Sequence, residues 1–252
     1  NHRPDHFRFA DHALTYDPAT FAVGAHGKLA GYEWLRFLQS RYHPKGKTIF
    51  GNMGPSTESW PSYTGLDIIG IESSLFRDRA LMAYHRYGGF QKPVLTMNFV
   101  NLHKLDDRAT AEAFVLASAQ VGHFPSTGRM VREGYQSYGD VCHTYYPALK
   151  EMSEAGWEPE PLAAGAHAER FGRGEVVYLA VRAPAEGRQV ELTLLNEARP
   201  GARGPVVAMD AVQLAPMECA SEREGVRVRF TQGAEELTIV RVSSPANAER
   251  WL

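Results

Sequence analysis

Hydrophobic and polar positions in the first half of the chain alternate between two periods. Between residues 30 and 121, segments with apolar residues three or four positions apart are interleaved with short, nearly continuous apolar runs. The first spacing predicts helices packed by one face, and the second predicts strands buried on both faces. In chain order the predicted elements are a helix (30–42), a strand (47–54), a strand (66–72), a helix (73–89), a strand (92–99) and a helix (106–122).

Single residues refine these boundaries. The segment 43–46 (HPKG) should end the first helix, and Gly88 and Gly89 should end the second. For the second helix we expect Ser73 or Ser74 as the N-cap. One face of the first helix carries Tyr32, Leu35, Leu38 and Tyr42. In the second helix, Leu81 and Tyr84 are expected to face inward. One face of the third helix carries Ala111, Phe114, Val115, Ser118 and Val121.

The alternation of strands and helices predicts a parallel α/β architecture. Strands without polar alternation are buried on both faces, which requires helices on the sheet and parallel pairing. Three strands are too few to close a barrel, but they fit the last three strands of a (β/α)8 barrel. On this interpretation, the segment HFRFADHALTYDPAT is the loop after an earlier strand that lies outside this chain.

The second half of the chain changes character. Residues 123–157 are a transition rich in glycine and aromatic residues, and YPALKEMSEAGW within it predicts a helix with Pro147 near its first turn and Gly156 past its end. From about residue 160, the segments EVVYLAVRAP, RQVELTLLNEA, VRVRFTQG and EELTIVRVS alternate as short strands. We therefore expect part of a barrel at 1–158 and an antiparallel β-sandwich at 159–252, divided at the Pro-Glu-Pro run at 159–161.

Composition supports two compact units and excludes several partners. The chain has 252 residues, 44% of them hydrophobic, and 27 basic against 29 acidic residues give a net charge of −2. This balance predicts neither a nucleic-acid-binding nor a membrane-binding protein. Cys142 and Cys219 are isolated and form no CxxC pattern, and the chain has no HExxH motif, so no metal and no cofactor are expected.

The first residues of the chain are typical of a segment within a domain. The chain starts NHRPDHFRF, lacks an initial Met and lacks the basic-then-apolar pattern of a signal peptide. No window approaches 18 consecutive apolar residues, so a soluble chain is expected. We expect a processed product or a fragment, and its compartment stays open, including secretion or export to a periplasm if an upstream segment carries a signal peptide.

Polar side chains stand where three predicted parallel strands end. They are Asn52, Glu72 and Asn98, and the carboxyl ends of parallel strands share one edge of a sheet. Amide side chains both donate to and accept from hydroxyl groups, while a carboxylate can move protons, so the set suits a polyhydroxylated substrate. The alternative is that strand ends are exposed and polar by default.

Hydrolysis of a glycoside by carboxylates needs a second carboxyl group. Asp11 and Asp17 precede the first helix, and Glu58 follows Asn52 beside Trp60, so all three fall on the loop side of the sheet. Asp67 opens its strand at the opposite end, where a structural role is expected. A partner carboxylate outside this chain is the remaining option.

Aromatic residues and histidines accompany these loops. Sugar rings pack their C–H faces on aromatic rings, which makes Trp60 and Tyr16 candidate substrate contacts. Glu58 and His12 are polar candidates in the same loops. The other aromatic or rim residues considered are Tyr63, Phe99, His103, Phe124, Tyr135 and Tyr138. The alternative for the last three is packing between the barrel and the sandwich.

The motifs resemble a known group of enzymes. ADHALTYDP, YEWLRFL, GKTIFGNMGP, DIIGIES and AYHRYGGFQKPVLTMNF together resemble the C-terminal half of (β/α)8-barrel glycoside hydrolases, in particular a group of poorly characterised glycosidases. The tail AERFGRGEVVYLAVRAP resembles the start of the β-sandwich that follows the barrel in many of them. The resemblance implies that Glu72 ends a late barrel strand in an acid/base position, with Asn52 and Asn98 as neighbours on the substrate side. The early strands that often carry the nucleophile are absent from this sequence.

Three hypotheses follow. The first is a glycoside hydrolase with Glu72 as general acid/base or nucleophile and the second carboxylate in the loop from Asp11 to Asp17, or in upstream sequence. The second is a carbohydrate-binding protein without catalysis. The third is a half-barrel that is inactive or that assembles with a partner chain through its open sheet edge. The sugar, its anomer, the stereochemical outcome and the oligomeric state stay open.

Overall fold

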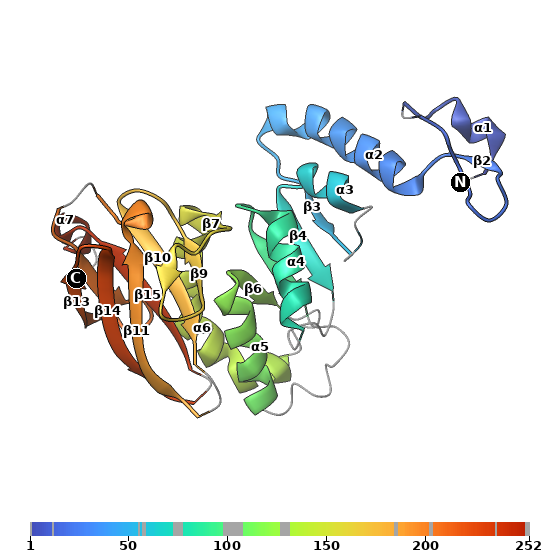
Figure 1. Cartoon of the computed structure of the whole chain (residues 1–252). Helices are drawn as coiled ribbons and strands as arrows, with labels where there is room; N and C mark the ends of the chain where they lie inside the picture. The colour runs from blue at the N-terminus through green and yellow to red at the C-terminus, as the bar shows by residue number, and fades with distance from the viewer. Residues whose placement is uncertain are drawn as a thin grey trace. The chain divides into compact units, whose positions relative to one another are not determined.

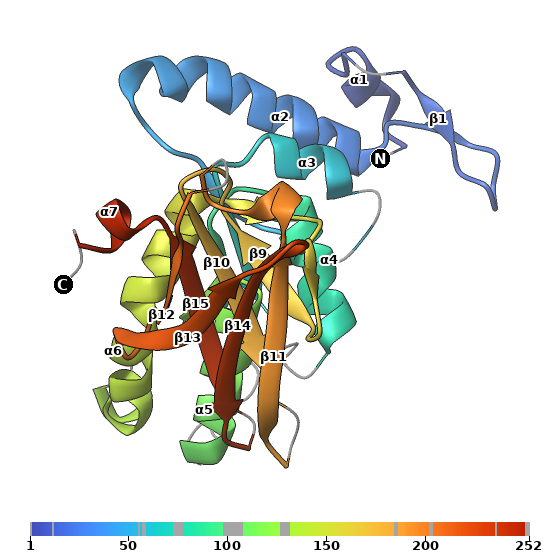
Figure 2. The ribbon, with the colours of Figure 1, turned by 60° about the vertical axis from the view of Figure 1, so that its left-hand side comes forward.

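The structure is a computed structural model of the whole chain, shown in Figures 1 and 2. It describes residues 2–11, 13–54, 56, 59–72, 78–97, 108–126, 132–183, 186–201, 204–234 and 236–249; the side chains of 132–138 are not described. The chain divides into two compact units, Asn1–Glu72 and Ser73–Leu252. Each unit is described by itself.

The first unit contains a small hairpin, a long helix and two parallel strands. The hairpin pairs β1 (Thr15–Tyr16) with β2 (Val23–Gly24) after the short helix α1 (Pro4–Phe7). Next come α2 (Gly27–Tyr42) and the 3-10 helix η1 (His43–Lys45), then β3 (Phe50–Asn52), α3 (Trp60–Thr64) and β4 (Ile68–Glu72). β3 and β4 are parallel. The helix and both strands predicted in this region are confirmed.

Asp67 holds the starts of β3 and β4 together. Its Oδ2 accepts the backbone N–H of Ile49 at 2.7 Å and lies 2.9 Å from Nε2 of His43. This carboxylate ties the end of the helical segment to the strands, which agrees with the structural role expected for it. The last residues of β3 and β4, Asn52 and Glu72, therefore stand at the opposite end of the pair.

The second unit begins with alternating helices and parallel strands. They are α4 (Arg79–Gly89), β5 (Val94–Met97), α5 (Arg108–Gln120), β6 (His123–Ser126) and α6 (Arg132–Ala155). β5 and β6 are parallel. The face of α5 is buried as predicted, since Ala111, Phe114, Val115, Ser118 and Val121 are all within 8% of full burial.

Two predictions for α4 are wrong. The helix begins at Arg79, and its N-cap is Asp78. The expected caps Ser73 and Ser74 lie outside the described residues. Its buried residues are Met82, His85, Arg86 and Gly89. Leu81 and Tyr84 are only partly buried, because the buried face is rotated by one residue and includes two ionisable side chains.

The prediction for Pro147 is also wrong. α6 runs over 24 residues with Pro147 inside it, so this proline is not in the first turn. A proline lacks the N–H that would bond to the preceding turn, and α6 nevertheless continues to Ala155. Gly156 follows the helix in the left-handed region (φ 84°), as expected for the residue past a helix end.

The rest of the second unit is a large antiparallel sheet that curls. Its nine strands follow the order β7-β9-β10-β15-β12-β13-β14-β11-β8. The bounds are β7 (Trp157–Glu158), β8 (Ala163–Ala164), β9 (Ala168–Phe171), β10 (Val176–Arg182), β11 (Arg188–Leu195), β12 (Val207–Asp210), β13 (Ala215–Ser221), β14 (Gly225–Gln232) and β15 (Leu237–Ser243), with η4 (Asn196–Ala198) and α7 (Pro245–Ala248) as short helices. The first half of β13 pairs with β12 and its second half pairs with β14, so one strand joins the two halves of the sheet.

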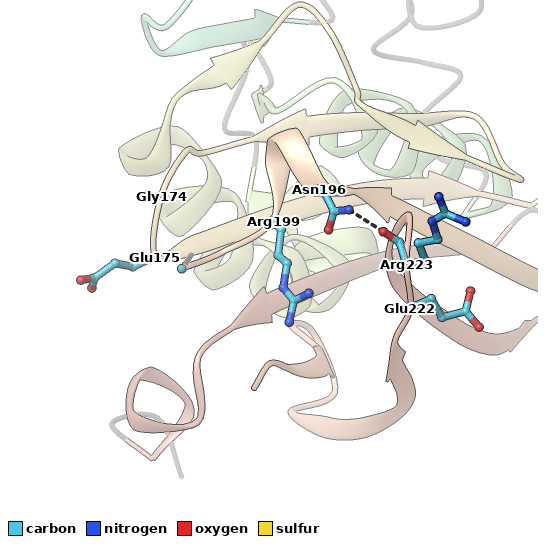
Figure 3. A pocket seen from close by; sticks show the side chains of 7 residues that line it. Gly174, Glu175, Asn196, Arg199, Glu222 and Arg223 are labelled. Carbon is cyan, nitrogen blue, oxygen red and sulfur yellow. Dashed lines mark hydrogen bonds between the residues drawn. The ribbon is translucent and has the colours of Figure 1, made fainter. Parts of the chain in front are cut away.

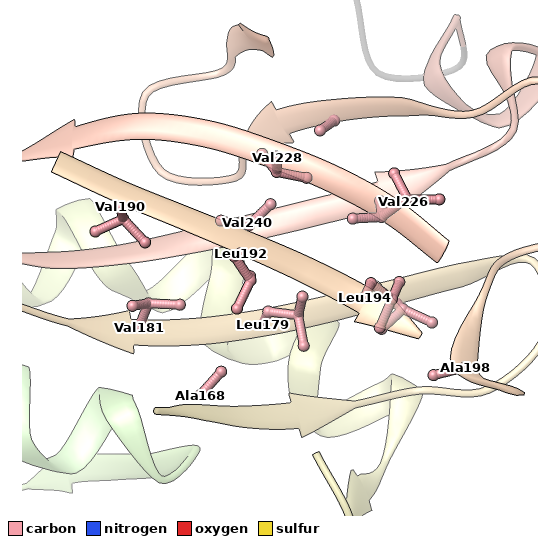
Figure 4. Close-up of a cluster of buried hydrophobic side chains, with 13 residues drawn as sticks. Ala168, Leu179, Val181, Val190, Leu192, Leu194, Ala198, Val226, Val228 and Val240 are labelled. Atoms are coloured by element: carbon pink, nitrogen blue, oxygen red, sulfur yellow. The ribbon is translucent and has the colours of Figure 1, made fainter. Parts of the chain in front are cut away.

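Two hydrophobic clusters lie on the two sides of β10 and β15. One cluster fills the inside of the curl, where residues such as Leu179, Leu192 and Val240 face one another (Figure 4). The other joins the outer side of these strands to the helices and includes Leu149, Ile239 and Ala119. β15 is therefore buried along its whole length, and the helices share a core with the antiparallel sheet.

The observed fold thus combines parallel strands and helices with a curled antiparallel sheet. The division at residue 158/159 and the closure into a barrel and a sandwich stay predictions. Within the described ranges, no helix has both the length and the hydropathy that crossing a membrane requires.

Candidate functional site

Asn52 and Glu72 lie together at the ends of two parallel strands. In the register of β3 and β4, Asn52 lies opposite Gly70, two residues before Glu72. The amide Nδ2 of Asn52 donates a hydrogen bond to Oε1 of Glu72. Both side chains are exposed. The structure thus brings together two of the three residues predicted at the strand ends.

The alternation of side chains along β4 directs Glu72 to the open face of the pair. Ile69 and Ile71 are 0% and 3% exposed, so one face of β4 is buried. Successive side chains of a strand point to opposite faces, so Gly70 and Glu72 lie on the other face. Burial of the two isoleucines therefore fixes the side on which the carboxylate stands.

The pair can orient a substrate and move a proton. A hydrogen bond from an amide restrains the carboxylate in one orientation, and within the described part of the chain Oε2 of Glu72 has no protein partner. Asn52 keeps a second amide N–H and a carbonyl oxygen, which can bind hydroxyl groups. An exposed carboxylate with an amide beside it suits acid, base or nucleophilic chemistry on a polyhydroxylated molecule.

Asp17 is engaged in its own turn. Its Oδ1 accepts the backbone N–H groups of Ala19 and Thr20 at 2.8 and 3.0 Å, and its Oδ2 lies 3.6 Å from His2. The backbone hydrogen bonds from Thr20 and Ala19 lower the pKa of the Asp17 carboxyl. These contacts close the loop between β1 and β2. Asp11 is exposed.

The remaining predicted residues are placed in part. Tyr16 in β1 is 66% exposed, and Trp60, the first residue of α3, is 39% exposed. The Trp60 ring lies 5.7 Å from that of Tyr63, which is only 1% exposed and belongs to the core. Phe124 in β6 lies against Tyr146, with ring centroids 6.4 Å apart. Outside the described residues or side chains lie His12, Glu58, Asn98, Phe99, His103, Tyr135 and Tyr138.

A group of buried ionisable residues was not predicted. Arg86 on α4 is 3% exposed, and its guanidinium donates to the carbonyl oxygens of Phe90, Lys92 (2.6 Å) and Gly122 (3.5 Å). It lies 5.9 Å from the centre of the Trp157 ring. Burial lowers the pKa of Arg86 to about 9. This arginine holds the turn between α4 and β5 against the start of β6.

Two histidines complete this buried group. His85 is 1% exposed, and burial lowers its pKa to about 4. His123 is fully buried, with Nδ1 3.0 Å from the hydroxyl of Thr96. Burial, with the charge of Arg86 next in size, holds the pKa of His123 well below its usual range. The spacing of Met82, His85, Arg86 and Gly89 by three and four is the sequence signal that could have found this face.

Two of the cavities in the second unit are larger than the others described, and no described residue that was predicted for the site is among their lining residues. One of about 780 Å³ lies at an end of the antiparallel sheet (Figure 3). Its lining comprises Gly174, Glu175, Asn196, Arg199, Gly201, Glu222 and Arg223. The other, of about 750 Å³, is bordered by α5, α6 and loops of the sheet, with Arg108, Tyr145 and Glu236 among its lining residues. No cluster with the donors of a metal site occurs among the described side chains.

Comparisons with known proteins give structural neighbours but no sequence family. No family model matches the chain, and no curated protein matches it. A glycoside hydrolase family 30 subfamily 8 xylanase from Clostridium acetobutylicum aligns with 84% of this chain and 59% of its own, at 10% identity and a TM-score of 0.43. An α-fucosidase from Thermotoga maritima aligns with 94% of this chain and 62% of its own, at 9% identity and a TM-score of 0.40.

This likeness concerns the course of the backbone. The chain spans about three fifths of the length of both solved structures, since 59% and 62% of them are covered. At these TM-scores no residue is equated between the chains and no activity is transferred.

Proposed function

We propose that this chain is the C-terminal part of a (β/α)8-barrel glycoside hydrolase, followed by an antiparallel β-sandwich. Glu72 is its general acid/base or its nucleophile, and Asn52 binds substrate beside it. Asn98, Trp60, Tyr16, Glu58 and His12 are the further substrate contacts of this proposal. The substrate is a carbohydrate, and the bond cleaved is an O-glycosidic bond.

The observation that carries the proposal is the hydrogen bond from Asn52 to Glu72. The two side chains come from neighbouring parallel strands and stand at their carboxyl ends, where enzymes with such sheets bind ligands. An amide that orients a carboxylate leaves hydrogen-bonding groups available to sugar hydroxyls. Burial of the opposite face of β4 directs the pair outward.

The second carboxylate of the mechanism is proposed among Asp11, Asp17 and Glu58, or in sequence outside this chain. The hydrogen bonds of Asp17 within its own turn favour Asp11 or Glu58 over it. A retaining enzyme requires the two carboxyl groups about 5–5.5 Å apart, and an inverting enzyme about 6.5–9.5 Å.

A specific observation favours a second candidate, a carbohydrate-binding protein without catalysis. Among the residues of β3 and β4, Glu72 is the only carboxylate. A single carboxylate between hydrogen-bonding groups is sufficient to hold a glycan. A half-barrel that gains activity only with a partner chain is the third candidate.

Replacing Glu72 by Gln distinguishes hydrolase from binding protein. Gln keeps the size of the side chain but cannot transfer the proton or attack, so a hydrolase should lose about 10²- to 10⁴-fold in kcat. The measurement is the cleavage of 4-nitrophenyl glycosides of pentoses and hexoses, in both anomers, by the protein as expressed from its own gene. A binding protein should release no nitrophenol and should change its affinity about tenfold or less, which is the loss of one hydrogen bond.

The matched control is Glu186→Gln, an exposed carboxylate in the loop before β11. It should leave kcat unchanged. Equal turnover by Glu72→Gln and the wild-type protein contradicts the catalytic role of Glu72.

A further inference from the structure

An exposed aromatic ring stands on the same face as the Asn52–Glu72 pair. Phe50 precedes Asn52 by two residues on β3, so the two side chains point to the same side of the strands. Phe50 is 49% exposed. The open face therefore presents an apolar ring next to an amide and a carboxylate.

Gly70 provides the space in which Phe50 and Asn52 lie. A Cβ atom on Gly70 would be 2.7 Å from Cζ and 3.0 Å from Cε2 of Phe50, and it would also collide with Oδ1 of Asn52. The backbone of Gly70 is not in the left-handed region, since it is absent from the positive-φ residues. Glycine is therefore needed at position 70 because it leaves space for its neighbours, and not because of an unusual backbone angle.

Both residues of β3 thus lie across Gly70. The outer edge of the Phe50 ring and the amide of Asn52 cover this glycine, which is why Gly70 is buried while Phe50, Asn52 and Glu72 on the same face are exposed. From this position the Asn52 amide reaches Oε1 of Glu72. A larger residue at position 70 would displace the ring and the amide together.

We propose that Phe50 is the platform of a sugar-ring subsite and that Gly70 positions both Phe50 and Asn52 for it. The proposal rests on the proposed function, because it names the ligand of the same face: a pyranose or furanose ring of a glycoside. The C–H face of such a ring stacks on Phe50, and its hydroxyl groups bond to Asn52 and Glu72. Residues two apart on a strand are roughly 6.5 Å apart, a spacing that one sugar ring spans.

The rival role of Phe50 is packing against other polypeptide. Under that role the ring contributes to stability, so Phe50→Leu should keep the stability that Phe50→Ala loses. Stacking needs a flat ring, so leucine does not restore binding. Phe50→Leu and Phe50→Ala therefore separate the two roles.

Glycine positions on opposite faces supply a matched pair of variants. A Cβ on Gly51 would be 2.9 Å from the side chain of Leu66, which is 2% exposed and lies on the buried face. Gly51→Ala and Gly70→Ala thus place a similar collision on the two sides of the same strands. Only Gly70→Ala disturbs the open face.

The experiment measures binding of methyl α- and β-glycosides of pentoses and hexoses by saturation-transfer NMR and titration, with thermal unfolding recorded for every variant. Phe50→Ala, Phe50→Leu and Gly70→Ala should each weaken binding about tenfold or more. Gly51→Ala should lower the unfolding temperature and leave affinity unchanged. Phe37→Ala, which removes a ring that is 52% exposed on α2, should also leave affinity unchanged.

Each outcome decides the proposal. If Phe50→Leu binds as tightly as the wild-type protein, or if no glycoside binds the wild-type protein, the subsite is overturned. If Gly70→Ala does not fold, the two Phe50 variants give the decision. Binding that depends on Phe50 without cleavage supports the subsite and contradicts the proposed hydrolase, whereas cleavage that is unaffected by Phe50→Ala contradicts the subsite alone.

Discussion

At the scale of single residues, the buried histidines of the second unit make its stability depend on pH. His85 is neutral in the folded chain because burial lowers its pKa to about 4, against about 6.5 for an exposed imidazole. Between these values the unfolded chain binds the proton and the folded chain does not. The free energy of unfolding therefore falls as the pH is lowered from about 6.5 to 4, by on the order of 3 kcal/mol for this group.

Urea unfolding at several pH values tests this dependence. His85→Gln should flatten the slope of unfolding free energy against pH in this window, and the remaining slope belongs to other groups such as His123. His143→Gln, a change at an exposed position of α6, serves as the control and should keep the wild-type slope. The same slope for His85→Gln and the wild-type protein contradicts the assignment.

Site residues could be predicted from the sequence where the pattern of apolar residues shows at which residue a strand ends. Glu72 was expected at a strand end because its apolar run stops there, and the neighbouring Asn52 followed from parallel pairing. The hydrogen bonds of Asp17 with its own turn depend on the fold of the loop, which no periodicity encodes. Gly70 gave no signal either, since its role depends on which side chains of the adjacent strand lie across it.

At the scale of secondary-structure elements, the start of α4 is set by one side chain. Asp78 accepts the N–H of Leu81 through Oδ1 at 3.0 Å, which satisfies one of the unpaired donors in the first turn. Asp78→Ala should lower the free energy of unfolding by about 1 kcal/mol. For a unit of this size, the unfolding temperature should fall by about 2–4 °C.

Asp78→Asn separates capping from charge. Asparagine is also a good N-cap, so this variant should keep most of the stability in thermal unfolding followed by circular dichroism. If the Asp78→Ala and Asp78→Asn variants are equally stable, Asp78 does not act as a cap.

Element types were predicted better than element faces and lengths. The helices and the long strands have clear periods, whereas β7, β8, β9 and β12 were missed because they are at most four residues long. β13 was missed although its seven residues alternate between half-buried and exposed. The face of α4 differs from the predicted one because the buried side includes His85 and Arg86. Their burial depends on carbonyl groups of other segments that accept from Arg86.

At the scale of the whole molecule, the helices and the antiparallel sheet of the second unit should unfold together. Ile239 on β15 is fully buried in the cluster that also contains Leu149 of α6 and Ala119 of α5. Ile239→Ala should cost about 2–5 kcal/mol. Hydrogen exchange should therefore accelerate by similar factors in α5, α6, β10 and β15.

Thr231→Ala, a change at an exposed position of β14, is the control and should alter exchange in neither layer. Faster exchange in the sheet with unchanged exchange in α5 and α6 would show two independent cores. That result would support a domain boundary near residue 158.

The double pairing of β13 links the two halves of the curled sheet in a further way. None of its seven residues is fully buried, and only its half-buried side, with Met217 and Cys219, packs against the core inside the curl, so its own side chains select its alignment weakly. The alignment is imposed by β12 at one end and by β14 at the other. A one-residue shift of β13 against β12 also shifts β13 against β14. The registers of the two halves of the sheet are therefore set together during folding.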